Sequence, residues 1–332
     1  MHQTKILITG VAGLIGSNLL NQLICNEQCE IIGVDNLVTG KRENIERHLK
    51  NKKFKFCEVD ILNRQKMSQI AKGKIDVIFH EAAYKKISEN EISVDLMDNN
   101  IIGTKNMLEI ARKNKAKFIF ASTSDVYGPS HNMPLRETDQ LILGGGNIKR
   151  SSYAASKLAG EHLCFGYYKD YGIPIIILRY FGTFGAGASK TWKGGHIPLF
   201  IQKILNDEAI TIHGDGSQTR SMCYITDITE GTIEAMKRKS AVGEIINLGG
   251  EEEISVLMSA KLIQKACSKL RKQKIDLKIN YLPHKKIFGD YKEIMRRKPD
   301  LTKAKKILGF NPKISFMDGL ELYIKNIEKK NE

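Results

Sequence analysis

The sequence contains no C-x-x-C pair and no long uninterrupted apolar run. Its six cysteines lie mostly in apolar stretches, which predicts buried thiols in a reducing compartment rather than a metal site or a disulfide framework. No stretch approaches the roughly 18 apolar residues of a membrane-spanning helix, and the apolar start from Ile6 to Ile15 is broken by glycines and lacks a basic region before it. We therefore expect a cytoplasmic protein without a signal peptide or membrane anchor.

Acidic residues are scarce relative to basic ones. The chain has 52 Lys and Arg against 37 Asp and Glu, which gives a formal net charge of +15. This excess fits an anionic small substrate, a nucleic acid or simply a lysine-rich proteome. Aromatic residues make up only 7% of the chain and form no aromatic-rich RNA motif, so a nucleic-acid partner is disfavoured.

Short β-branched runs alternate with amphipathic segments from Lys5 to Tyr180; the runs include KILIT, EIIGV, FKFCEV, IDVIFH, KFIFAS and IPIIILRY. This alternation is typical of the α/β class. We expect a Rossmann-type, doubly wound parallel sheet over residues 1–180, completed by parts of residues 224–250. The glycine-rich loops that follow predict a smaller α/β substrate-binding domain over residues 181–332.

Three glycines follow the first predicted strand. Gly10, Gly13 and Gly16 form G-x-x-G-x-x-G, where a tight turn leads into a helix whose first amides can face a diphosphate. The spacing suits a dinucleotide, although such glycines can also serve only to pack a helix against a strand.

Asp35 ends the second predicted strand, roughly 20 residues beyond the last glycine. A carboxylate at this place accepts hydrogen bonds from the adenosine ribose and repels a 2′-phosphate, which favours NAD over NADP. Lys41 and Arg42 in the next loop offer an alternative contact for a phosphate. Asp60, after the third strand, is either an adenine contact or a helix N-cap.

A second polar cluster predicts redox chemistry. Tyr153 and Lys157 lie four residues apart on one face of a predicted helix, so we expect the ammonium to lower the pKa of the phenol toward that of a general base. Thr123 ends the strand KFIFAS and is the expected hydroxyl partner of a substrate oxygen. The alternative readings are a solvated helix face and a capped turn.

The motifs together resemble the extended short-chain dehydrogenase/reductases of the NAD-dependent epimerase/dehydratase family, over nearly the whole chain. They occur in the order which that family uses: G-V-A-G-L-I-G from Gly10, H-E-A-A from His80, N-I-I-G-T from Asn100, S-T-S-D-V-Y-G from Ser122, Y-A-A-S-K from Tyr153, G-D-G-S-Q-T-R from Gly214 and R-K-P-D from Arg297.

The resemblance implies a role for individual residues. The implied catalytic residues are Thr123, Tyr153, Lys157 and Asp125; the cofactor contacts are Gly10, Gly13, Leu14, Ile15, Gly16, Asp35, Asn36, Asp60, Ile61, Ala82, Ala83, Asn100, Tyr153 and Lys157; the substrate contacts are Lys85, Ser124, Arg150, Arg220 and Arg297. It further implies NAD as cofactor, a nucleotide-sugar substrate, most often a UDP-sugar, and a homodimer. The long helical patterns over residues 95–113 and 151–171 retain apolar residues beyond one stripe, as helices at a subunit interface do.

The implied reaction begins with oxidation of a sugar hydroxyl, most often at C4, and the fate of the 4-keto sugar defines the enzyme. Asp125 resembles the glutamate that dehydratases and decarboxylases carry, but Ser124 replaces the aspartate of a complete dehydratase pair. Arg150 resembles decarboxylases, whereas Lys85 resembles some 4-epimerases. We expect a 4-epimerase first and a lyase as the alternative, either a UDP-glucuronate decarboxylase or a 4,6-dehydratase.

The sugar pocket departs from the family pattern. Relatives have R-x-F-N-x-x-G-P where this chain has R-Y-F-G-T-F-G-A from Arg179, so Gly182 replaces an asparagine that contacts substrate and Ala186 replaces the proline. A distant alternative to the enzyme is a non-catalytic NAD-binding or RNA-binding protein of the same fold, suggested by the charge of +15.

Overall fold

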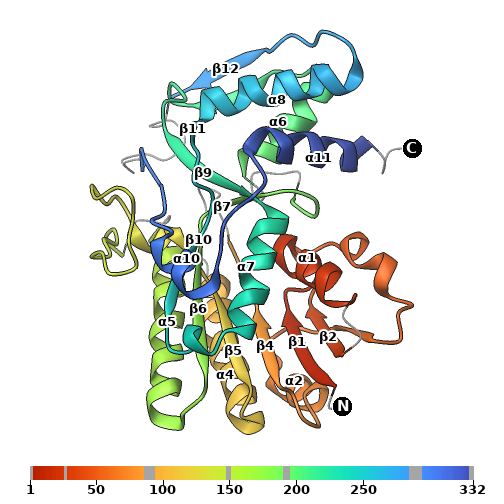
Figure 1. The fold of residues 1–332 in the computed structure, drawn as a ribbon, viewed down its shortest axis with the longest axis vertical. Helices are drawn as coiled ribbons and strands as arrows, with labels where there is room; N and C mark the ends of the chain where they lie inside the picture. The colour runs from red at the N-terminus through yellow and green to blue at the C-terminus, as the bar shows by residue number, and fades with distance from the viewer. Residues whose placement is uncertain are drawn as a thin grey trace.

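The computed structural model describes residues 3–25, 28–85, 94–146, 151–189, 195–283 and 294–328. A seven-stranded sheet forms the larger part, and a smaller part lies beyond the carboxyl ends of its strands (Figure 1). The strand order is β10-β6-β5-β4-β1-β2-β3, and every neighbouring pair is parallel. The expected doubly wound parallel sheet is thus confirmed.

The strands of this sheet coincide with the β-branched runs of the sequence. They are β1 (Thr4–Thr9), β2 (Cys29–Asp35), β3 (Phe54–Glu58), β4 (Val77–His80), β5 (Lys117–Thr123), β6 (Ile175–Tyr180) and β10 (Ile245–Leu248). The chain returns to the sheet for β10 after it has built β7, β8 and β9 elsewhere, so residues distant in sequence complete the edge next to β6.

Helices cover both faces because successive strand side chains point to opposite sides. Ile6 and Ile8 face α1 (Leu14–Leu23), α7 (Ile225–Lys237) and α10 (Thr302–Leu308), whereas Leu7 between them faces the other side. That second face is covered by α2 (Arg64–Ile70), α4 (Gly103–Asn114) and α5 (Ser151–Tyr171). Each fully buried aliphatic side chain contributes about 1.5–3 kcal/mol of hydrophobic stabilisation.

The two longest predicted helices are both present. α5 spans Ser151–Tyr171. The other begins with α3 (Val94–Met97), continues through a π-helical turn at Asp98–Ile102 and ends in α4. π-turns inside helices are frequent at functional sites, and this one places Asn99 and Asn100 beside the loop that follows β4.

The smaller part, called the cap below, is formed by residues 196–224, 253–282 and 316–328. Its elements are α6 (His196–Leu205), β8 (Ile210–His213), β9 (Thr219–Tyr224), β11 (Glu253–Ser255), α8 (Val256–Arg271), β12 (Ile279–Leu282) and α11 (Phe316–Glu328), and β7 (Gly182–Phe184) pairs with β9. α6, α8 and α11 share a separate apolar core. Among the described residues, no helix is both long and apolar enough to span a membrane.

Candidate active site

A cavity of about 550 Å³ lies between the carboxyl ends of the sheet strands and the cap. Strands β2 and β4 lie on opposite sides of β1. The chain runs from β1 to β2 on one side and returns from β3 to β4 on the other, and a crevice remains at the carboxyl ends of the strands between these two connections. Doubly wound sheets bind their ligands in such a crevice. His213 and Arg220 of the cap close the far wall.

Most of the residues expected to bind or react line this cavity. They are Gly10, Gly13, Leu14, Ile15, Gly16, Asp35, Asn36, Ile61, Ala82, Ala83, Lys85, Thr123, Ser124, Asp125, Tyr153, Lys157, Arg220 and Arg297. Asp60 and Asn100 do not line it, and Arg150 lies outside the described residues.

The glycines between β1 and α1 allow the backbone to turn tightly. Gly10 has φ +69°, and a Cβ atom on it would lie 2.7 Å from the backbone nitrogen of Ala82. A Cβ atom on Gly16 would overlap the carbonyl oxygen of Gly10, so neither position accepts a side chain without a backbone shift. α1 has no acidic residue in its first turn, and Leu14 and Ile15 line the cavity. The helix amides at this end suit an anionic diphosphate.

Asp35 lies at the carboxyl end of β2 and is buried. Its carboxylate accepts hydrogen bonds from the backbone N–H groups of Ala12 (3.0 Å) and Leu37 (2.8 Å). Burial raises the pKa of this carboxyl, and the backbone hydrogen bonds oppose that rise. A Cβ atom on Gly40 would lie 2.8 Å from both carboxylate oxygens, so the glycine leaves one side of Asp35 open to a ligand.

Asp60 was expected to contact adenine or to cap a helix; it does not line the cavity, and it is not the N-cap of α2. One of its oxygens accepts from the Asn36 side chain at 2.7 Å and the other from the backbone N–H of Leu62 at 2.8 Å. The N-cap of α2 is Asn63, which accepts from the backbone N–H of Lys66. Asp60 therefore fixes the turn after β3 and orients Asn36, which does line the cavity.

Asn100 was expected on the cofactor side; it does not line the cavity, and its side chain makes three hydrogen bonds within the protein. Its oxygen accepts from the backbone N–H of Tyr84 at 2.8 Å, and its nitrogen donates to Tyr84 O at 3.0 Å and to Ser156 Oγ at 2.9 Å. The residue ties the loop after β4 to α5. The neighbouring Asn99, to which the sequence analysis gave no role, does line the cavity.

Thr123, Tyr153 and Lys157 meet at one end of the cavity. Thr123 ends β5, and Tyr153 and Lys157 lie one turn apart near the start of α5. Lys157 is 2% exposed and donates a hydrogen bond of 2.7 Å to the carbonyl oxygen of Ala121. Burial lowers the pKa of Lys157 to about 8, although the charge of Glu81 works in the opposite direction.

The expected fall in the pKa of Tyr153 does not occur in this structure. Burial of the phenol raises its pKa, the negative charge of Asp125 raises it further, and a hydrogen bond with Thr123 opposes the rise. The sequence predicted the position of Lys157 correctly, but it could not show that the negative charge of Asp125 acts on the Tyr153 phenol. Deprotonation of Tyr153 therefore needs additional positive charge at this end of the cavity.

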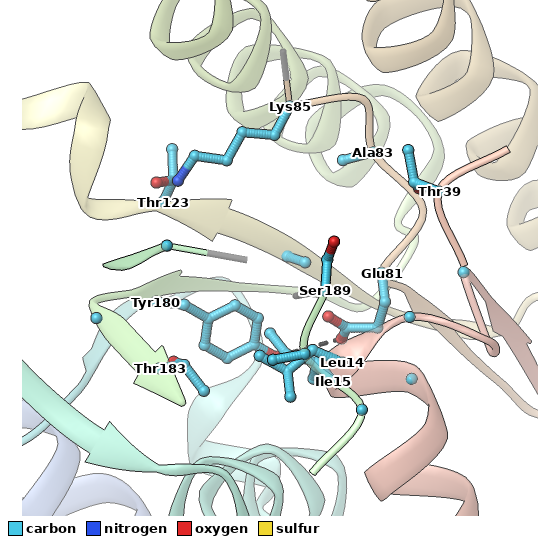
Figure 2. Close-up of a pocket in the computed structure, with 18 of the residues that line it drawn as sticks. Leu14, Ile15, Thr39, Glu81, Ala83, Lys85, Thr123, Tyr180, Thr183 and Ser189 are labelled. Carbon is cyan, nitrogen blue, oxygen red and sulfur yellow. Dashed lines mark hydrogen bonds between the residues drawn. The ribbon is translucent and has the colours of Figure 1, made fainter. Parts of the chain in front are cut away.

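Asp125 lies between two cationic side chains. Its carboxylate contacts a guanidinium nitrogen of Arg297 and lies 3.5 Å from the ammonium of Lys85. The Lys85 ammonium is also 5.3 Å from the ring centroid of Tyr153, and Figure 2 shows the side chain extended toward Thr123. The turn after β5 is capped by Thr123, whose Oγ1 accepts from the backbone N–H of Asp125 at 3.1 Å. Thr123, rather than Asp125, is therefore the N-cap of this turn.

The cap side of the cavity carries buried polar atoms that have no hydrogen-bond partner within the described part of the chain. They are Gln218 Oε1, Ser221 Oγ and Arg297 Nε. Gln218 and Arg297 line the cavity. A buried polar atom without a partner costs about 1–3 kcal/mol, so a polar ligand that bonds to these atoms would recover that cost.

The comparison with known proteins identifies the family. Residues 6–249 match the model of the NAD dependent epimerase/dehydratase family. The chain belongs to this family. Its members are NAD-dependent enzymes, as the resemblance of the motifs implied.

Known proteins match this epimerase/dehydratase chain over nearly its whole length. It is 38% identical over 319 residues to the UDP-N-acetyl-alpha-D-glucosaminuronate decarboxylase of Bacillus cytotoxicus. The aligned residues cover 96% of this chain and 95% of that protein. The crystal structure of UDP-glucuronic acid 4-epimerase from Bacillus cereus with UDP-glucuronic acid and NAD superposes with a TM-score of 0.84 at 34% identity, covering 98% of this chain and 100% of that one. Pal from Bacillus thuringiensis gives a TM-score of 0.88 at 30% identity, with coverage of 98% and 100%.

The cavity of this family member fits NAD. The glycine turn leaves room for a diphosphate, and the open side of Asp35 can accept ribose hydroxyls. The crevice continues without interruption to Tyr153 and Lys157, where a hydride would be exchanged.

Glu81 and Tyr180 are among the cavity residues to which the sequence analysis gave no role. Glu81 and Tyr180 both follow or end a parallel strand at its carboxyl end, β4 and β6 respectively, and both line the cavity. That position was the available signal, because parallel sheets place ligand contacts there. Glu81 stood within the recognised H-E-A-A motif but had no role assigned to it.

Proposed function

We propose that this chain uses NAD to oxidise the C4 hydroxyl of a UDP-hexuronate and then converts the resulting 4-keto sugar. The observation that carries the proposal is the pair of cations, Lys85 and Arg297, beside Thr123 and Tyr153. A hexuronate brings a carboxylate to the redox end of the cavity, where these cations lie. The names of the Bacillus cytotoxicus decarboxylase and the Bacillus cereus 4-epimerase also specify UDP-linked uronates.

Three residues of the chain have separate roles in the proposed oxidation. Thr123 orients the substrate oxygen, and Tyr153 accepts the hydroxyl proton as the C4 hydride leaves. Lys157, held by the Ala121 carbonyl, places a positive charge beneath this site. Bound NAD⁺ supplies the hydride acceptor and a further positive charge, which would lower the pKa of Tyr153 against the burial and Asp125 effects.

For the fate of the 4-keto uronate we favour decarboxylation. The C6 carboxylate is β to the new ketone, so the C5–C6 bond breaks with CO₂ as leaving group and its electron pair enters an enolate over C5, C4 and the C4 oxygen. C5 then takes a proton from solvent water, and the hydride returns to C4 while the proton held by Tyr153 returns to the C4 oxygen. A carboxylate clamped by cations resists this loss, and Asp125 already occupies both Lys85 and Arg297.

The second candidate is the 4-epimerase that the sequence reading placed first. Lys85 favours it, because its side chain is 45% exposed and can leave Asp125 to hold the substrate carboxylate. An epimerase would rotate the intact 4-keto uronate and return hydride to the opposite face. The likeness to the Bacillus cereus 4-epimerase supports this alternative.

The deciding experiment incubates the purified protein and NAD with UDP-glucuronate and with UDP-N-acetylglucosaminuronate, and follows products by mass spectrometry and NMR. Loss of CO₂ supports the decarboxylase, and an unchanged mass with inverted C4 supports the epimerase. Tyr153→Phe is the matched control and should be inactive in either case. Turnover of neither sugar by the wild type would refute the proposed substrate class.

We also propose a homodimer in a reducing compartment, the cytoplasm. All six cysteines are free thiols in the structure. Ile102, Tyr168 and Tyr171 are 46%, 41% and 55% exposed, and they lie on the π-turn before α4 and on α5, as an interface there requires. Light scattering at the mass of one chain would contradict the dimer.

A further inference from the structure

Glu81 is a carboxylate in the cavity that the proposed reaction does not use. It directly follows β4 and lies beside the glycine turn, where its carbonyl carbon would be 2.9 Å from a Cβ atom on Gly10. Its Oε1 accepts a hydrogen bond of 3.2 Å from the hydroxyl of Tyr180 (Figure 2). Its Oε2 is buried and has no hydrogen-bond partner among the residues that the structure describes.

The groups that act on Glu81 place it at the redox end of the cavity. Lys157 and Tyr153 of α5 interact with it electrostatically, and Tyr180 of β6 bonds to it. The backbone N–H of Glu81 donates to the carbonyl oxygen of Thr9 at the end of β1, and the apolar Leu14 and Ile15 of α1 line the same cavity (Figure 2). Glu81 therefore shares its end of the cavity with the residues proposed to move the proton and hydride.

The charge of a carboxylate at this place distinguishes the two forms of the cofactor. The nicotinamide ring of NAD⁺ is positively charged and that of NADH is neutral, so a nearby anion stabilises the oxidised form relative to the reduced one. A water-poor cavity strengthens the effect, because the interaction is screened less than at the surface.

We propose that Glu81 is a cofactor-binding residue which biases the bound cofactor toward NAD⁺ and so promotes return of the hydride to the keto sugar. This inference rests on the proposed function, because it assigns a role at the same NAD site. An enzyme that must finish each turnover with NAD⁺ benefits from a residue that disfavours accumulation of NADH. A glutamate buried here with one oxygen unpaired otherwise only destabilises the fold.

The bias should depend on pH. Burial raises the pKa of Glu81 to about 7, while Lys157 and the Tyr180 hydrogen bond oppose the rise. The carboxylate is therefore charged above this pH and neutral below it. The other titratable groups that act on it are Lys157, whose pKa is about 8, Tyr153 and Tyr180, and they remain in a Glu81→Gln variant. The difference between wild type and variant therefore isolates Glu81.

The test measures dissociation constants of the full-length protein for NAD⁺ and for NADH by calorimetry, after bound nucleotide has been removed. In Glu81→Gln, which keeps an oxygen for the Tyr180 hydroxyl, the ratio Kd(NAD⁺)/Kd(NADH) should rise by about tenfold at about pH 8, the size expected of one partly screened charge. The difference should shrink at about pH 6, where the wild-type carboxyl is protonated. Glu81→Asp keeps the charge and should stay near the wild-type ratio.

The outcomes separate this inference from the function on which it rests. Binding of both nucleotides with the same ratio in wild type and Glu81→Gln at about pH 8 would overturn the role of Glu81 and leave the NAD site intact. An equal shift in Glu81→Gln and Glu81→Asp would also overturn it, because shape rather than charge would then be responsible. Binding of neither nucleotide by the wild type would overturn the NAD site itself and the inference with it.

Discussion

A buried ion pair behind the catalytic strands offers a sharp test of how this fold is held together. Arg179 of β6 donates from Nε to Glu161 Oε1 at 2.9 Å and from Nη2 to Glu161 Oε2 at 2.7 Å. The two side chains are 2% and 3% exposed. Ser122 of β5 also donates to Glu161 Oε1, at 2.5 Å. The pair therefore ties α5 to the two strands that present Thr123 and Tyr180.

Removing one partner leaves the other charge buried without compensation. Glu161→Leu should destabilise the protein by about 3–5 kcal/mol, because the guanidinium of Arg179 stays charged even without its partner and would be buried without a compensating carboxylate. The double variant Glu161→Leu/Arg179→Met should recover most of that loss, since a well-packed apolar pair often matches a buried ion pair.

Urea denaturation followed by circular dichroism gives the unfolding free energies of wild type, both single variants and the double variant. The reasoning predicts that the double variant is more stable than either single one. If Glu161→Leu costs less than about 1 kcal/mol, or if the effects of the two single changes simply add, the pair is not the coupled element described here.

Three further changes follow from the cavity. Gly16→Ala should weaken NAD binding in a calorimetric titration and destabilise the fold by about 1–3 kcal/mol, because the added methyl overlaps the Gly10 carbonyl. Tyr153→Phe should lower kcat by about 10²–10⁴-fold in a product assay while the Kd for NAD changes little, as expected on removal of a general base. The stability that protonation of Glu81 provides is present below its unfolded pKa and is lost as pH rises from that value to about 7, so the unfolding free energy of Glu81→Gln relative to wild type should grow over this range and level off above about pH 7 at about 3 kcal/mol, as thermal unfolding at a series of pH values would show.

The sheet could be predicted because its information is local. The run KILIT became β1, with Ile6 and Ile8 in one core and Leu7 in the other, since alternate residues of a buried strand face opposite layers. The glycine turn was equally local, because Gly10 and Gly16 meet within a few residues of each other. The order of the motifs along the chain then matched that of a known family, which predicted how these local features are combined.

The detailed roles in the site depend on residues distant in sequence. Asp125 contacts Arg297, 172 positions away, whereas Thr123 caps the turn that follows β5. The role of Asp125 therefore depends on this distant contact rather than on the residue type. Asn100 reaches Ser156, 56 positions away, and so ties the loop after β4 to α5. No spacing rule in the sequence predicts either partner.

The substitution at Gly182 shows the same limit in the sugar pocket. A Cβ atom there would overlap the sulfur of Met222 on β9, so the side chain of Met222 fills the space next to a position where relatives carry asparagine. Gly182 and Met222 both line the cavity. The sequence showed that the asparagine was missing but not that a methionine from the cap replaces its volume.

Charge is distributed unevenly along the cavity, and this distribution links the two proposals. Glu81 follows β4 beside the glycine turn, whereas Lys85 and Arg297 lie against Asp125, whose single negative charge balances them only in part. This distribution favours a positively charged nicotinamide beside Glu81 and an anionic uronate beside Lys85 and Arg297. Under the two proposals, Asp125 is the group whose charge decides how firmly the uronate carboxylate is held.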